Sequence, residues 1–144
     1  MTLHTRALTD GGAELTIRLT AAEVEAIGRT EAESLGEYLD TALWGLAVLR
    51  SGRTVRSDQR EITAADLHDV IRDLHKHLVP MVGGIQDAAI RRHRELGGTT
   101  TQLAAAMDSP RSSAQRRREA LDQPGPRQAA AARWETWAAT RRQH

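Results

Sequence analysis

A chain of 144 residues is long enough to fold as one domain with a core, and its 40% hydrophobic content includes no Phe, one Tyr and three Trp. The core must therefore come from Leu, Ile, Val and Ala, which favours helices over a β-sandwich or barrel. The absence of cysteine excludes a disulfide framework and a thiolate metal site. No membrane-spanning run and no signal-peptide pattern occur, so we expect a soluble, cytoplasmic protein without a membrane partner.

The charged side chains are unevenly distributed along the chain. Residues 1–88 carry 9 basic and 14 acidic side chains, whereas residues 89–144 carry 11 basic and 5 acidic ones. A basic segment gains free energy on a polyanion because it releases condensed counterions. The C-terminal part is therefore the one that we expect to meet nucleic acid or an acidic partner.

The N-terminal segment predicts an arm followed by a strand. Residues 1–12 have no sustained period and end in Asp-Gly-Gly, which is typical of a flexible arm. Apolar and polar residues then alternate from Glu14 to Leu19, as in a short half-buried strand. Thr20 followed by Glu23 has the spacing of a capping box at the start of a helix. We assign residues 13–82 to a region of one strand and several helices that supplies a dimer interface.

Two longer helices are predicted within that region. Leucines and alanines recur at helical spacing from Leu35 to Leu49, and a second apolar stripe follows the capping residue Thr63 as far as Leu78. Pro80 and the pair Gly83-Gly84 are predicted to end the second helix, because proline lacks an amide proton and glycine is a weak helix former. The histidines of this helix do not have the four-residue spacing of a helix-borne zinc site, so we predict a solvated face there.

Residues 83–121 predict three consecutive helices. The first ends at Gly97-Gly98, the second begins at the capping box of Thr99 and Gln102, and the third begins after a break at 108–110. Ser109 is predicted to cap the third helix, with Pro110 as its first residue. So tight a connection requires a small side chain where the helices cross, which is Ala104.

The third helix, residues 111–121, has two different faces. Ala114 and Leu121 are seven residues apart and share a face that can pack inward. Polar residues recur on another face, namely Ser112, Gln115, Arg116 and Glu119. Arg and Gln are the side chains that make paired hydrogen bonds to guanine and adenine in the major groove. Arg111, at the start of the helix, can reach either a base or a phosphate.

The stretch LAAAMDSPRSSAQRRREAL, residues 103–121, resembles the helix-turn-helix of bacterial, actinobacterial-type DNA-binding proteins. This resemblance implies a DNA-binding region at residues 83–121. The residues that would face the bases are Arg111, Ser112, Gln115 and Arg116, and those that would hold the DNA backbone are Thr100, Thr101, Arg117 and Arg118. Asp108 stands where that family has a turn glycine, a tolerable exchange because Asp enters left-handed conformations more readily than most residues.

A second resemblance concerns the N-terminus. The segments ELTIRLTAAEVEAI and SLGEYLDTAL are similar to a ribbon-helix-helix module, whose strands pair across a dimer and enter the major groove. Glu14, Thr16 and Arg18 would then be the residues that contact DNA. The acidic neighbourhood repels phosphate, which favours a strand used only for dimerisation.

Together these patterns predict a mainly α fold: a helical domain with a short N-terminal strand and a C-terminal helix-turn-helix. Residues 122–144 would form a linker and a terminal helix whose Trp134 and Trp137 dock on the domain or on a dimer partner. We expect sequence-specific binding of double-stranded DNA by a homodimeric transcriptional regulator. The alternatives are a protein-interaction or assembly module and a non-specific nucleoid or plasmid-maintenance protein. No catalytic or phosphate-binding motif occurs, so we expect no enzyme, cofactor, metal or small-molecule effector.

Overall fold

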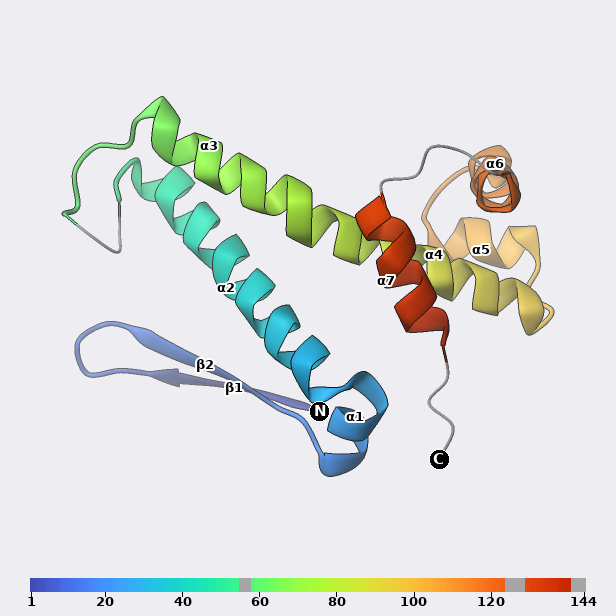
Figure 1. The fold of residues 1–144 in the computed structure, drawn as a ribbon, viewed down its shortest axis with the longest axis horizontal. Helices are drawn as coiled ribbons and strands as arrows, with labels where there is room; N and C mark the ends of the chain where they lie inside the picture. Colours follow the sequence, from blue (N-terminus) through green and yellow to red (C-terminus); the bar gives the residue numbers. More distant parts are fainter. Residues whose placement is uncertain (55–57, 124–128, 141–144) are drawn as a thin grey trace. The chain divides into compact units, whose positions relative to one another are not determined.

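The computed structural model describes residues 1–54, 58–123 and 129–140, and within these ranges the chain is mainly helical with a two-stranded N-terminal sheet (Figure 1). The predicted fold class is confirmed at this level. No helix within the described ranges combines the length and the apolar character needed to cross a membrane. The chain divides into two compact units, residues 1–40 and the chain from residue 41 onward, and the boundary falls within helix α2 (Arg29–Ser51).

The first unit begins with a β-hairpin. β1 (Thr2–Ala7) pairs antiparallel with β2 (Ala13–Arg18), so that Leu3 lies opposite Ile17. The strand at residues 14–18 is thus confirmed, but the prediction of a flexible arm over residues 1–12 was wrong, since they contain β1. Every residue of β1 is exposed, so the strand has no buried apolar alternation by which its sequence could reveal it.

A capping box starts the first helix, α1 (Ala21–Ile27), as predicted. The Glu23 amide donates to Thr20 Oγ1 at 3.2 Å, and the Thr20 amide donates to Glu23 Oε2 at 2.8 Å. The N-terminal ammonium of Met1 also donates to Glu23 at 2.6 Å. The ammonium and then Thr20 lower the pKa of Glu23 to about 2. Gly28, at a φ of 101°, separates α1 from α2.

In the second unit, the end of α2 packs against α3 (Ala64–Asp73), which runs in the opposite direction (Figure 1). Val48 and Val70 are buried at this contact. A Cβ atom on Gly45 would lie 2.9 Å from Val70 Cγ1, so the approach of the two helices leaves no room for a larger residue there. The helix predicted over residues 35–49 is confirmed within α2.

The helix that starts at Ala64 does not end at Pro80 or at Gly83-Gly84, and this prediction was wrong. α3 passes through a π-helical turn, η1 (Leu74–Leu78), into α4 (Val79–Glu95). A proline ring clashes with the carbonyl group four residues earlier, which here belongs to Lys76 in the wider π turn. Residues 82 and 83, at which the sequence analysis divided dimerisation from DNA binding, lie inside α4.

The terminal helix α7 (Ala129–Ala139) is confirmed and packs along α4. Its closest approach is at Gly84, where a Cβ atom would lie 2.5 Å from the Ala131 carbonyl oxygen and 2.7 Å from the Glu135 nitrogen. Trp134 and Trp137 meet edge to face with ring centroids 5.0 Å apart. Gly84 therefore serves as the contact point for α7.

Candidate nucleic-acid interface

Two short helices, α5 (Thr100–Ala106) and α6 (Arg111–Asp122), follow α4. Gly97 ends α4 at a φ of 83°, and the ring of His93 fills the space where Gly98 would carry a Cβ atom. The predicted capping box starts α5: the Thr99 amide donates to Gln102 Oε1 at 2.8 Å, and the Gln102 amide donates to Thr99 Oγ1 at 3.2 Å. The start of α5 is thus fixed by local hydrogen bonds.

The turn between α5 and α6 is tight and hydrogen-bonded. Asp108 adopts the left-handed conformation with a φ of 45°, and the amide of Ser109 donates to the carbonyl of Ala104 at 3.0 Å. The prediction that Ser109 caps α6 was wrong. Pro110 occupies the cap position, and the Ser109 hydroxyl is buried without a partner among the described residues. Proline fixes the chain direction there without a side-chain bond.

A small apolar core holds the two helices together on α4. It consists of buried residues from all three helices: Ile90, Leu103, Ala104, Ala114 and Leu121. Met107 packs against this core from the turn. Ala104 lies in it as the tight connection predicts, and Ala114 opposes it from α6 with no exposed surface. Because two alanines lie in this core, the helices can approach closely.

The residues predicted to face bases divide into two groups. Arg111, Ser112 and Arg116 are exposed on α6 and make no hydrogen bond or ion pair with the part of the chain that the structure describes. Gln115 instead accepts a bond from Thr100 Oγ1 at 3.2 Å and donates to Glu119 at 2.6 Å. The first group is available to an external partner, and Gln115 is held between α5 and its own helix.

The residues predicted to hold a DNA backbone are also divided. Thr101 is exposed at the start of α5. Arg118 donates to Thr100 Oγ1 at 3.1 Å, and so joins the bridge between α5 and α6. Arg117 points to α4, where it forms an ion pair with the buried carboxylate of Asp87. Arg117 thus balances a buried charge, a role that its sequence position did not indicate.

An ion-pair frame behind α6 was missed by the sequence analysis. Arg91 of α4 forms an ion pair with Glu135 of α7 and donates to the Leu121 carbonyl of α6 at 2.5 Å. Arg94 donates to Asp122 at 2.6 Å, and this hydrogen bond lowers the pKa of Asp122. These partners are 28 to 44 residues apart, so no local pattern could have revealed them. The one available signal was Asp87, an acidic residue on the buried face of α4.

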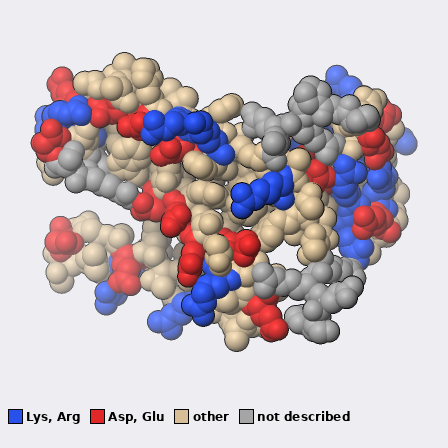
Figure 2. Space-filling view, viewed as in Figure 1, with Lys and Arg blue, Asp and Glu red and all other residues tan. Residues whose placement is uncertain are grey.

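Figure 2 shows basic side chains gathered over the part of the second unit that holds α5, α6 and the end of α4, with acidic side chains between them. Arg111 and Arg116 contribute positive charge from α6, and Arg92 and Arg94 contribute it from the last turn of α4. This arrangement suits a partner that carries closely spaced negative charges.

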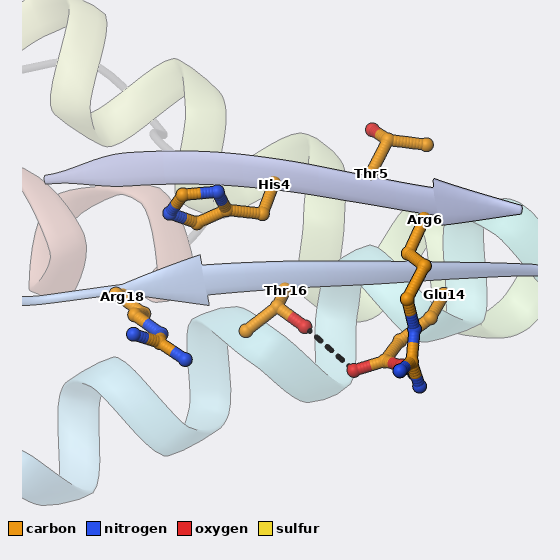
Figure 3. Close-up of a pocket in the computed structure, with 6 residues that line it drawn as sticks. All are labelled: His4, Thr5, Arg6, Glu14, Thr16 and Arg18. Atoms are coloured by element: carbon orange, nitrogen blue, oxygen red, sulfur yellow. Dashed lines mark hydrogen bonds and ion pairs between the residues drawn. The ribbon is translucent and has the colours of Figure 1, made fainter.

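The second predicted contact surface lies on the β-hairpin in the first unit. Glu14, Thr16 and Arg18 of β2 line an open hollow together with His4, Thr5 and Arg6 of β1 (Figure 3). Glu14 accepts bonds from Arg6 at 2.5 Å and from Thr16 at 3.1 Å. The edge of β2 that faces β1 is therefore paired within the chain. Among the described residues, no cluster of three potential metal ligands occurs here or elsewhere.

No protein-family model, no curated protein and no solved structure matches this chain. Any functional inference must therefore come from the geometry and chemistry of the residues themselves.

Proposed function

We propose that this chain is a cytoplasmic transcriptional regulator that binds double-stranded DNA sequence-specifically, as a homodimer, through a helix-turn-helix formed by α5 and α6. The observation that carries the proposal is the exposed side of α6, where Arg111, Ser112 and Arg116 have no partner within the described residues. An α-helix fits the major groove, and arginine is the commonest side chain that reads guanine there.

The packing beneath α6 supports the same proposal. The alanine-containing core and the Arg117–Asp87 pair fix α6 on α4, and the Arg91 bond to the Leu121 carbonyl fixes its end. A recognition helix must be held rigidly, because base contacts tolerate little displacement. We assign base contacts to Arg111, Ser112 and Arg116, and contacts to the DNA backbone to Thr101 and Arg118.

The bridge of Gln115 modifies this assignment. Its amide oxygen accepts from Thr100 and its amide nitrogen donates to Glu119, so both ends are occupied before DNA arrives. Reading an adenine with Gln115 requires these bonds to be exchanged for bonds to the base. We therefore place Gln115 and Thr100 among the residues that orient α6, with a base contact by Gln115 only after that exchange.

The test is a fluorescence-anisotropy titration of the full chain with duplexes selected from genomic fragments and with random duplexes. Arg116→Ala should weaken binding to a selected duplex by about 1–3 kcal/mol and affect random duplexes little, because it removes a base contact. Arg133→Ala is the matched control, since Arg133 is exposed on α7, away from this surface. Binding to both kinds of duplex should weaken steeply with added salt.

The contrary outcomes identify the alternatives. Equal affinity for every duplex would replace the regulator with a non-specific nucleoid or plasmid-maintenance protein. Failure to bind any duplex at low salt would leave the protein-interaction or assembly module.

A further inference from the structure

An apolar surface in the second unit lacks a partner within the described residues. On α2, Leu43, Leu46 and Leu49 are 52%, 54% and 56% exposed. Successive residues of an α-helix are about 100° apart, so these three leucines occupy one sector about 120° wide. We name this set, together with Ile71 of α3, the leucine face. Ile71 is 62% exposed.

The four side chains lie on one side of the α2–α3 pair. Leu46 and Leu49 each follow, by one residue, the positions that contact α3, which are Gly45 and Val48. Ile71 likewise follows Val70 by one residue. In two right-handed helices that run in opposite directions, the residue after each contact position points to the same side of the pair. The leucine face is therefore a continuous surface that spans both helices.

The size of this surface fits a protein partner. A half-exposed Leu or Ile leaves on the order of 50–100 Å² of apolar area, so the leucine face offers roughly 200–400 Å². Each partner in a standard interface buries about 800 Å², of which roughly 60% is apolar. The leucine face thus supplies about half or more of that apolar area, and the half-buried Ala42 and Leu67 border it.

We infer that the leucine face is the site at which a second copy of this chain docks, with the two α2 helices antiparallel across a two-fold axis near Leu46. Such an axis places Leu46 against its own copy and Leu43 against Leu49, so an aliphatic surface meets an identical one. Two helical hairpins joined in this way form a four-helix arrangement.

The charges that flank the leucines along α2 favour the antiparallel arrangement. Asp40 precedes the leucines and Arg50 follows them in the same helix. In an antiparallel pair centred on Leu46, Arg50 of one copy lies opposite residue 42 of the other, within about 3 Å along the axis of Asp40. The two-fold axis repeats this pairing of opposite charges, whereas a parallel pair would place like charges together.

This inference deepens the proposed function, because it names the surface that would join two DNA-reading units, and it rests on that function only for its purpose. The mass of the full chain is measured by sedimentation equilibrium without DNA at tens of micromolar. We expect twice the chain mass of 15.8 kDa for the wild type and for Leu96→Glu, and the mass of one chain for Leu46→Glu. Leu96 is the matched control, since it is 70% exposed and lies at the end of α4.

A charge exchange tests the antiparallel arrangement without changing the apolar surface. Arg50→Asp alone should raise the dimer dissociation constant about two- to tenfold, and adding Asp40→Arg should restore it. Circular dichroism checks that each variant keeps the helical content of the wild type. Failure of the double variant to recover would overturn the antiparallel pairing.

The two proposals fail in different ways. A wild type with the mass of one chain, or a Leu46→Glu variant that remains a dimer, would overturn the docking site whatever the DNA result. A dimer that Leu46→Glu separates but that binds no duplex would support the docking site and contradict only the proposed function.

Discussion

Two adjacent glycines in α4 have opposite surroundings. At Gly84 a Cβ atom would lie between 2.5 and 2.7 Å from the Ala131 oxygen, Trp134 Cβ and the Glu135 nitrogen. At Gly83 it would meet nothing within 4 Å. Both residues lie inside a regular helix, so the difference arises only from α7 on one side of it. The pair offers a measurement of how strongly α7 is docked.

Gly84→Ala should lower the free energy of unfolding by about 1–3 kcal/mol, because the new methyl group displaces the backbone of α7. Gly83→Ala should raise it by about 0.4–1 kcal/mol, since alanine restricts the unfolded chain and favours the helix. Urea unfolding followed by circular dichroism measures both. Equal effects of the two substitutions would contradict the close docking of α7 at Gly84.

At the scale of elements, α6 is attached to α4 by a charged contact near its end. Asp122 accepts two bonds from Arg94, at 2.8 and 2.6 Å, and Arg94 lowers the pKa of this carboxyl. A carboxyl whose pKa is lowered on folding stabilises the folded state above its ordinary pKa of 3.8. That contribution disappears as the pH falls from that value through the lowered pKa. The attachment of α6 should therefore weaken in acid.

Asp122→Asn should be less stable than the wild type at neutral pH, because it removes the charge that Arg94 meets. The difference in thermal unfolding midpoint should shrink as the pH falls below 3.8, since the wild-type carboxyl then becomes neutral as well. Thermal unfolding at a series of pH values measures this gap. A gap that stays constant down to the lowest pH would show that the ion pair is not its source.

The elements that the sequence predicted are those whose signals are local. The capping boxes at Thr20 and Thr99 are three-residue patterns, and the apolar period of α2 repeats within each turn. Elements that depend on distant partners were missed. β1 exists because it pairs with β2, and α4 continues through Gly84 because α7 packs there. Their local sequences resemble an arm and a helix end.

The candidate site divides in the same way. The turn at Asp108, the inward Ala114 and the exposed Arg111 and Arg116 followed from local pattern and resemblance. The positions of Arg117 and Gln115 did not, because each is fixed by a neighbouring helix. A polar residue on a helix surface shows only that it can bond, and tertiary packing decides to what.

At the scale of the whole molecule, two copies would present two α6 helices to one duplex. A dimer reads two half-sites about one turn of DNA apart, which is about 34 Å or 10 base pairs from centre to centre. We expect a selected duplex to contain a pseudo-palindrome and to bind two chains. Each half-site alone should bind far more weakly, because the contacts of the second α6 are lost.

A spacing series tests this expectation. Inserting about 5 base pairs between the half-sites places them on opposite faces of the duplex, so affinity should fall, and inserting about 10 should restore part of it. Anisotropy titrations of the full chain on such duplexes supply the measurement. Affinity that does not depend on spacing would indicate that the two chains bind separately.

The π turn η1 has a consequence for the way this chain tolerates change in length. Each residue added to or removed from a helix rotates everything beyond it by about 100°, and the wider turn at Leu74–Leu78 accommodates one residue more than a regular helix would. Deleting His75 would leave every side chain of α5, α6 and α7 intact and yet swing all three around the axis by more than a quarter of a revolution relative to α2. The number of residues between Val70 and Gly84 is therefore under as strict a constraint as the identity of either one.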